Sequence, residues 1–239
     1  MIIIPARLKS SRFVEKILRP IGDVPMFIAT ARRVEGLDRI CIAVDEESVL
    51  EIAKNHGFDA ILTQKNHESG TDRINEACAL LGLKDDELII NVQADEPLIE
   101  RENVLKFRDF ALSCEDAFMM SCYKRVEAEQ AQDANLVKVV CDKAGLALYF
   151  SRAKIPYERE SFGEDFRVHL GIYAYRVRAL REFCSWEVSA LERAEKLEQL
   201  RALENGKKIK MLEIKTQSVG IDTLEDYERV LRRMGKNPS

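Results

Sequence analysis

The chain has 239 residues, of which 46% are hydrophobic, enough to build a substantial core in one large domain or two small ones. Its formal net charge of −4 argues against a nucleic-acid-binding protein, whose surface would be basic. No apolar run approaches the roughly 18 residues of a membrane span, so no membrane association is expected.

The first half of the sequence alternates between short, β-branched apolar runs and longer segments with helical periodicity. The runs predict strands at residues 2–4, 39–44, 60–62 and 88–92, and the segments predict helices at 26–34, 49–55 and 71–81. Ser69 or Thr71 is placed to cap the third helix. Alternation of strands and helices predicts a parallel sheet.

The pattern changes in the second half, where the sheet is expected to become mixed. Strands are predicted at 118–123, 138–141, 146–150, 168–175 and 209–213, the second and third of them forming a hairpin, and helices at 103–114, 178–185, 189–203 and 223–234. No linker, repeat or low-complexity segment interrupts the chain. The predicted fold is therefore α/β, a single domain over residues 1–239 with a middle β insertion at roughly 118–205.

The six cysteines are scattered and mostly lie inside apolar runs. They form no Cys-x-x-Cys pair, and no histidine lies at the spacing of a zinc ligand. The three isoleucines at the start are interrupted by Pro5-Ala6-Arg7, which is not the pattern of a secretion signal. Reduced thiols and a cytoplasmic location are expected.

The loop behind the first strand carries four cations, Arg7, Lys9, Arg12 and Lys16, and one carboxylate, Glu15. A polyphosphate needs its charge neutralised from several sides, and this loop could do so without the glycines of a P-loop. The plain alternative is a solvated basic loop. The choice depends on which other residues join the cations.

Two aspartates are candidate partners of that loop. Ligands of open α/β sheets bind at the carboxyl ends of the strands, and Asp95 follows the fourth predicted strand. Magnesium bound to a triphosphate takes one or two protein carboxylates, so Asp95 is a candidate ligand. Asp222 is a second candidate if the end of the chain folds back over the sheet. By spacing alone, Asp222 equally well starts the last helix, with Thr223 as the cap and Asp226 as its partner.

The strand predicted at 168–175 has two different faces. Alternation places His169, Gly171 and Tyr173 on the face opposite the core. The missing side chain of Gly171 leaves room for a polar molecule against the backbone. An ordinary exposed sheet face is an equally good interpretation.

The helix predicted at 189–203 carries an apolar core stripe, and Glu192 and Lys196 are spaced as an ion pair. Glu198 and Gln199 are then left on the surface. They could hydrogen-bond a polyol, although solvation is the default interpretation.

Taken in order, these segments resemble one family, the 3-deoxy-manno-octulosonate cytidylyltransferases or CMP-Kdo synthetases. The resemblance covers nearly the whole chain. It is carried by IPAR (4–7) with Ser11-Arg12 and Lys16, HESGTDR (67–73), NVQADEP (91–97), NLVKVV (135–140), ALYFSRAKIP (147–156), HLGIYAYR (169–176), LEQLR (197–201) and GIDT (220–223). Each motif alone is weak, but eight in the same order are specific.

The resemblance implies transfer of CMP from CTP to the anomeric hydroxyl of 3-deoxy-D-manno-octulosonate (Kdo), with release of pyrophosphate, for lipopolysaccharide biosynthesis. The attack on the α-phosphorus would be in line and magnesium-dependent. It further implies a Rossmann-like nucleotidyltransferase fold with a mixed, mostly parallel sheet flanked by helices, and a homodimer in which the insertion serves sugar binding and dimerisation.

The resemblance also assigns residues. Asp95 and Asp222 would bind Mg²⁺ and act in catalysis with Arg12 and Lys16. The nucleotide would be bound by Pro5, Ala6, Arg7, Arg12, Lys16, Ser69, Gly70, Thr71 and Arg73. The sugar would be bound by Gln93, Arg152, His169, Tyr173, Glu198 and Gln199.

The sequence departs from the family in two places. The usual first loop reads Leu-Pro-Gly-Lys-Pro-Leu, whereas Phe13-Val14-Glu15-Lys16-Ile17-Leu18 lacks both prolines and the glycine and adds a negative charge. Ala94 replaces a glycine, which matters only if the backbone there has a positive φ. A cytidylyltransferase for a Kdo analogue or a sialic-acid relative remains an alternative. So does a non-catalytic nucleotide sensor, although a sensor has no need of a metal pair.

Overall fold

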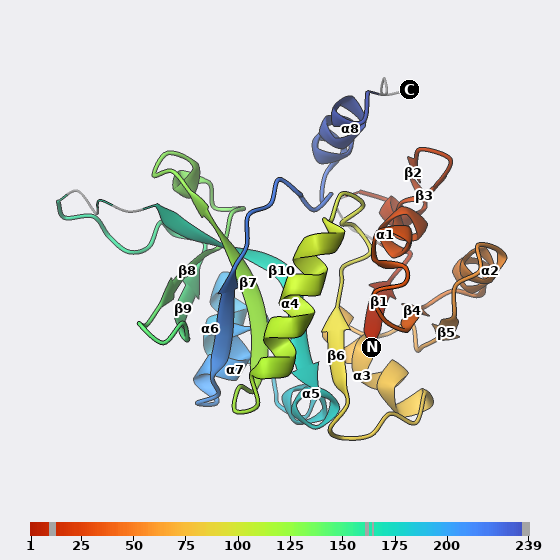
Figure 1. Cartoon of the computed structure of the whole chain (residues 1–239), viewed down its shortest axis with the longest axis horizontal. Coiled ribbons are helices and arrows are strands. Elements are labelled where there is room, and N and C mark those ends of the chain that lie inside the picture. Colours follow the sequence, from red (N-terminus) through yellow and green to blue (C-terminus); the bar gives the residue numbers. More distant parts are fainter. Residues whose placement is uncertain (10–12, 161–162, 164, 236–239) are drawn as a thin grey trace.

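The computed structural model describes residues 1–9, 13–160, 163 and 165–235 of the chain. It is an α/β fold built on one nine-stranded sheet, and Figure 1 shows helices packed on both faces of that sheet. Among the described residues, no helix is both long enough and apolar enough to cross a membrane.

The first half forms a parallel layer, as predicted. Its strands are β1 (Ile2–Ala6), β4 (Ile40–Val44), β5 (Ala60–Leu62) and β6 (Leu88–Asn91), in the spatial order β6-β1-β4-β5. Helices α1 (Met26–Val34), α2 (Glu47–Asn55), α3 (Gly70–Leu80) and α4 (Arg101–Ser113) lie between and after them, and β2 (Pro20–Ile21) and β3 (Val24–Pro25) form a small separate hairpin. All four strands of this layer therefore end at the same edge of the sheet.

The second half continues the same sheet in mixed orientation. Strand β10 (Phe166–Arg176) is antiparallel to β6 and to β7 (Met119–Val126), and β11 (Ile209–Glu213) runs parallel to β7. The predicted hairpin is present as β8 (Lys138–Cys141) and β9 (Ala147–Ser151), attached to β10. The remaining helices are α5 (Val177–Cys184), α6 (Ala190–Glu195), α7 (Leu200–Glu204) and α8 (Leu224–Arg233).

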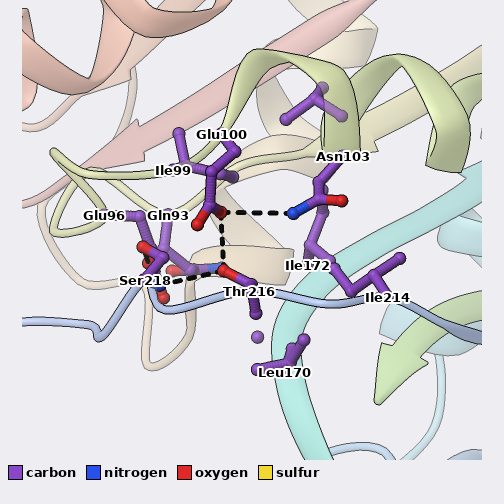
Figure 2. A pocket seen from close by; sticks show the side chains of 12 residues that line it. Gln93, Glu96, Ile99, Glu100, Asn103, Leu170, Ile172, Ile214, Thr216 and Ser218 are labelled. Carbon is purple, nitrogen blue, oxygen red and sulfur yellow. Dashed lines mark hydrogen bonds between the residues drawn. The ribbon is translucent and has the colours of Figure 1, made fainter. Parts of the chain in front are cut away.

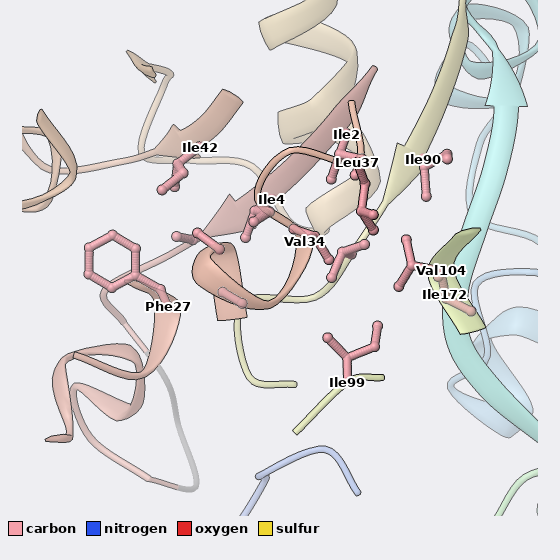
Figure 3. Packing of buried hydrophobic residues seen from close by; sticks show 14 of the residues in the cluster. Ile2, Ile4, Phe27, Val34, Leu37, Ile42, Ile90, Ile99, Val104 and Ile172 are labelled. Atoms are coloured by element: carbon pink, nitrogen blue, oxygen red, sulfur yellow. The ribbon is translucent and has the colours of Figure 1, made fainter. Parts of the chain in front are cut away.

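The core lies on both faces of the sheet because the buried strands carry apolar residues at successive positions. Ile2 and Ile4 of β1 point to the face covered by α1, α2 and α4, whereas Ile3 points to the face covered by α3 and α5. Figure 3 shows the first cluster, where Phe27 and Val104 pack over the strand residues. Burial on both faces fixes the register of the central strands.

One predicted helix is wrong. Residues 189–203 form two helices, α6 and α7, because Lys196 adopts the left-handed conformation with φ 53° and ends α6. The predicted ion pair of Glu192 with Lys196 is absent. Glu192 instead accepts two hydrogen bonds of 2.7 Å from the buried Arg201 guanidinium. The break between the helices turns Glu198 and Gln199 inward.

Candidate active site

The centre of the candidate site is Lys16, which lies between two carboxylates from distant parts of the chain. Its Nζ atom is 2.5 Å from Asp95 Oδ2 and 3.1 Å from Asp222 Oδ1. Burial lowers the pKa of the ammonium, but the charges of Asp95 and Asp222 and the hydrogen bonds to them outweigh burial and raise it. The chain end thus folds back over the sheet, as the hypothesis for Asp222 required.

Asp222 also has its predicted neighbours at the start of α8. Thr223 caps that helix, and its hydroxyl and the Asp226 carboxylate form a capping box. Asp226 accepts the backbone N–H of Asp222 at 3.1 Å. The helix start therefore fixes the backbone at Asp222, while the Asp222 side chain reaches Lys16.

The loop after β1 is held by Asp45, at the end of the neighbouring strand β4. Asp45 Oδ1 accepts the backbone N–H of Leu8 at 2.9 Å, and Arg7 is exposed at the edge of the sheet. Pro5 and Ala6 are buried as the last residues of β1. Arg12, which was predicted to contact the triphosphate, lies outside the described residues. The sequence analysis assigned no role to Asp45, although its place after a strand was a usable signal.

The amino end of α3 closes the site from a second side. Ser69 caps the helix, accepting the backbone N–H of Asp72 at 3.1 Å. A side chain at Gly70 would come within 3.3 Å of Pro5 Cγ, so the absence of one lets the helix start approach β1 closely. The positive end of the α3 dipole thereby points to the end of β1, which favours an anion there.

Arg73 lies deeper than a surface ligand would. It is 2% exposed, and its guanidinium donates to Thr63 Oγ1 at 2.5 Å and to Asp45 Oδ2 at 3.4 Å. Burial lowers its pKa, and the Asp45 carboxylate opposes that effect. In this structure Arg73 supports the loop through Asp45, with only part of its surface at the cavity.

These groups surround a cavity of about 330 Å³. Its lining consists of Pro5, Arg7, Lys16, Ile17, Glu68, Ser69, Gly70, Arg73, Gln93, Ala94, Asp95, Glu198 and Asp222. Cations, four carboxylates and a helix amino end therefore face one space. Among the described residues, no three His, Cys, Asp or Glu side chains are grouped to hold a metal, so protein groups alone do not complete a cage.

A much smaller pocket, of about 10 Å³, shares Glu198 with the first cavity. It is lined by Thr71, Met119, Tyr173, Tyr175, Phe183, Glu198 and Gln199. Glu198 Oε1 and Gln199 Nε2 are buried without a hydrogen-bond partner. Burial raises the pKa of Glu198 to about 7, although a hydrogen bond from Thr71 and the charge of Arg201 oppose the shift. Unpaired buried polar atoms are costly and are expected where a polar ligand binds.

His169 and Tyr173 lie close to that cavity on the same face of β10, as the alternation predicted. Their ring centroids are 5.4 Å apart, and Tyr173 Oη donates to Gln199 Oε1 at 3.3 Å. His169 Nε2 is 2.9 Å from Ser121 Oγ, and burial lowers its pKa to about 3. At neutral pH His169 is therefore an uncharged hydrogen-bonding group.

Arg152 lies away from both cavities. Its guanidinium donates to the backbone carbonyls of Glu195 at 2.7 Å, Ala134 at 3.2 Å and Lys196 at 3.4 Å. The side chain therefore holds the turn that ends α6. Of the six residues predicted to bind sugar, Arg152 is the one that the structure does not bring next to the others.

Gln93 stands between the main cavity and another, mostly apolar pocket under α4. Its Nε2 donates to Asn91 Oδ1 at 2.9 Å, and it lines both spaces. Figure 2 shows this mostly apolar pocket, where Glu96 and Glu100 face Thr216 and Ser218. Burial, and then the charge of Asp95, raises the pKa of Glu96 to about 7. Sequence analysis did not single out Glu96, although it directly follows Asp95.

Comparison with known proteins agrees with this geometry. A family model described as cytidylyltransferase matches residues 1–209. A 3-deoxy-manno-octulosonate cytidylyltransferase of a Nitratiruptor species is 51% identical, with 96% of this chain and 98% of that protein covered. The chain belongs to the 3-deoxy-manno-octulosonate cytidylyltransferase family. A cytidylyltransferase of the same name from Wolinella succinogenes is 48% identical, over 98% of this chain and 99% of that protein.

A solved cytidylyltransferase structure supports the same assignment. It is described as CMP:2-keto-3-deoxy-manno-octonic acid synthetase complexed with CTP. Its TM-score to this chain is 0.91 at 34% identity, covering 98% of this chain and 97% of the other. The nucleotidyltransferase fold expected from the sequence is thereby confirmed.

The two departures from the cytidylyltransferase pattern differ in their consequences. Glu15 stands where the first-loop pattern expected from the resemblance has glycine, and it has φ 51°, the left-handed region that glycine adopts without strain. Ala94 is not among the described residues with positive φ. Alanine at position 94 is therefore compatible with the backbone there. At position 15, in contrast, a residue with a side chain adopts the left-handed conformation that favours glycine.

Proposed function

We propose that this protein transfers CMP from CTP to the anomeric hydroxyl of Kdo and releases pyrophosphate. The observation that carries the proposal is the convergence of Lys16, Asp95 and Asp222 in a cavity that also reaches Glu198, whose buried Oε1 has no hydrogen-bond partner. The charged side of this cavity suits a nucleoside triphosphate, and the side with Gln93 and Glu198 suits a polyhydroxylated sugar. The names of the relatives, all cytidylyltransferases for this sugar, support that pairing.

The triphosphate would lie between the loop after β1 and the amino end of α3. Arg7 and Lys16 supply positive charge from the loop, and we assign Arg12 the same role. Ser69, Gly70 and Thr71 offer backbone N–H groups of the helix start, close to Pro5 and Ala6. Arg73 would act mainly by holding Asp45 and the loop in place.

Asp95 and Asp222 are the residues that would hold magnesium. Both approach the Lys16 ammonium, which shows that the site already draws one positive charge between them. A protein usually supplies one or two carboxylates to magnesium bound to a nucleotide. Phosphate oxygens and water fill the remaining positions around the ion. When bound, magnesium would supply positive charge that stabilises the phosphate oxygens during transfer.

The sugar would lie in the main cavity against Gln93 and Glu198, beside the adjoining face of β10. Glu198 Oε1 and Gln199 Nε2 have free hydrogen-bonding capacity there, and Tyr173 and Gln93 lie next to them. His169, uncharged at neutral pH, would donate or accept a hydrogen bond and not pair with the sugar carboxylate. Arg152 would have to exchange its carbonyl partners before it could reach that carboxylate.

Catalysis by these residues rests on positioning and charge. In-line attack needs the sugar hydroxyl and the α-phosphorus held in contact, which binding of both substrates in one cavity favours. Lys16, released from the aspartates, can then stabilise the negative charge that develops on the phosphates. No side chain is assigned as a general base.

The test is to incubate the purified protein with CTP, magnesium and either Kdo or a sialic acid, and to follow pyrophosphate release. We expect release with Kdo. Release with the sialic acid alone would assign the other acidic sugar, and CTP binding without release from either would favour a sensor.

Aspartate variants connect that activity to the site. Asp95→Asn and Asp222→Asn should each lower turnover by about a hundredfold or more, since each removes charge that positions the cation. Asp85→Asn is the matched control, because Asp85 forms an exposed ion pair with Arg181 before β6. Near-normal rates in Asp222→Asn would return that residue to a purely capping role.

We further propose that the protein works in the cytoplasm as a homodimer and that its product serves lipopolysaccharide biosynthesis. Reduced cysteines support the first point, since all six thiols are free in the structure. The proposed dimer, with residues 118–205 at its interface, can be tested by light scattering on the eluting protein.

A further inference from the structure

The segment that carries Asp222 has no regular structure of its own. Residues 214–223 connect β11 to α8 and belong to no strand or helix. Such a segment has no hydrogen-bonded ladder of its own, so its place depends on individual hydrogen bonds and packing contacts with the rest of the fold. Because the proposed function needs Asp222 opposite Asp95, whatever holds this segment bears on the reaction.

Two carboxylates that follow β6 hold it. Ser218 Oγ donates to Glu96 Oε2 at 2.7 Å, and Thr216 Oγ1 donates to Glu100 Oε2 at 2.5 Å (Figure 2). The backbone N–H of Gln217 donates to Glu100 Oε1 at 3.2 Å. Hydrogen bonds to carboxylates are stronger than those between neutral groups. We call these four side chains, Glu96, Glu100, Thr216 and Ser218, the clasp.

The clasp lies next to Asp95 and Asp222, the two proposed metal ligands. A side chain at Gly220 would come within 3.2 Å of Glu96 Oε1, so the segment lies against that carboxylate. The next residue, Ile221, donates its backbone N–H to the carbonyl of Asp95 at 3.0 Å, and its side chain is fully buried. Asp95 and Glu96 are adjacent, so one short turn presents one carboxylate to Lys16 and the other to the segment.

We infer that Glu96 and Glu100 are positioning residues that, through Ser218 and Thr216, set Asp222 at the distance from Asp95 that the cation requires. The inference rests on the proposed function. Neither glutamate lines the main cavity. Their role is to fix a connection without regular structure whose far end carries one of the two proposed ligands, and partners of metal ligands commonly act in this way.

The experiment measures CTP binding by calorimetry, once with EDTA and once with Mn²⁺ as the metal probe, and no sugar is added. The ratio of the two dissociation constants is the metal enhancement. Ser218→Ala and Glu96→Ala should each lower that enhancement roughly tenfold while leaving the EDTA value unchanged, since the triphosphate loop is untouched. Glu96→Gln keeps an acceptor for Ser218 and should retain most of the enhancement.

Two further variants complete the set. Gly220→Ala keeps every hydrogen bond but places a methyl group against Glu96, and it should also lower the enhancement. Ser113→Ala removes a hydroxyl that donates to the Phe110 carbonyl at the far end of α4, and it should leave the enhancement at the wild-type value.

Each contrary outcome has a definite meaning. An unchanged enhancement in Ser218→Ala overturns the inference. Equal losses in Glu96→Gln and Glu96→Ala with none in Ser218→Ala would make Glu96 a direct ligand, which also overturns it. No enhancement in the wild type would show that Asp95 and Asp222 do not bind a metal together with CTP, and it would overturn the inference. Failure of the proposed function is distinguishable, because it appears as absent pyrophosphate release while these binding values stay readable.

Discussion

At the scale of single residues, Glu15 shows how one substitution changes a loop without changing its path. The backbone has a left-handed φ of 51°, which suits the glycine expected here from the resemblance, and the Glu15 side chain is exposed. A residue with a Cβ in this conformation is destabilised by about 1–2 kcal/mol, whereas glycine is not. The loop that carries Lys16 is therefore held in place against local strain.

Glu15→Gly should stabilise the protein. The relief of strain exceeds the roughly 0.5–1 kcal/mol that glycine costs in the unfolded state, so a net gain near 1 kcal/mol, or about 2–4 °C in Tm, is expected. Glu15→Ala removes the charge but keeps the strain and serves as the control. Equal stabilisation by Ala and Gly in a thermal melt would assign the effect to charge.

Glu198 gives a pH-dependent prediction. Burial raises the pKa of its folded carboxyl to about 7, so between the ordinary value and 7 the folded state binds a proton that the unfolded state has lost. Stability contributed by this group is therefore lost as pH rises through that window. Glu198→Gln should be more stable than the wild type at pH 8, by on the order of 2 kcal/mol, and similar at pH 5.

Urea unfolding at both pH values checks the Glu198 prediction. Glu182→Gln, at an exposed carboxylate paired with Lys207, is the control and should show no such pH difference. A gain in Glu198→Gln that is equal at pH 5 and pH 8 would contradict the assignment. Loss of turnover alongside gained stability would fit a group retained for binding.

What the sequence could reveal at this scale differed between residues. Lys16 and Asp95 were identifiable because each follows a strand at the edge where parallel strands end. The inward position of Glu198 and Gln199 could not be identified, because it depends on the left-handed turn at Lys196. Neither glycine nor proline marks that turn in the sequence. Arg73 and Arg152 were predicted to be ligand-binding cations, but their partners in the structure are set by tertiary packing, which leaves no local signal in the sequence.

At the scale of elements, the amino end of α3 contributes to stability and lines the proposed nucleotide site. Ser69 satisfies one of the free N–H groups of the first turn, and the same turn faces the main cavity. Ser69 was predictable because its side chain and its place before an amphipathic segment are local signals. The close approach of Gly70 to Pro5 was not, because it joins two segments distant in the chain.

Ser69→Ala should lower the free energy of unfolding by about 1 kcal/mol through loss of the cap. It should also weaken CTP binding, measured by calorimetry, since the frayed first turn no longer presents ordered N–H groups. Ser189→Ala removes the equivalent cap from α6, away from the cavity, and should cost stability without affecting CTP. CTP affinity equal in the two variants would exclude α3 from the nucleotide site.

At the scale of the whole molecule, one sheet carries both proposed substrate regions. Strand β6 pairs with β1 on one side and with β10 on the other, so the proposed nucleotide and sugar sides share their central hydrogen bonds. The strand order in the first half follows from alternation of strands and helices. The position of antiparallel β10 beside β6 does not follow from that alternation. A pairing between strands about 80 residues apart leaves no local signal in the sequence.

The continuous sheet predicts that residues 118–205 unfold together with the rest of the chain. Trp186 is the single tryptophan, and it stacks on Phe118 with ring centroids 5.4 Å apart, so its fluorescence reports on that region alone. Far-UV circular dichroism reports on all helices and strands. The two thermal transitions should coincide, because unfolding this region would strip β6 of its β10 partner and expose the cluster on the α3 face. Measurements at several protein concentrations separate subunit dissociation from unfolding. If the fluorescence transition occurs at a lower temperature than the dichroism transition at every concentration, residues 118–205 unfold as an independent unit.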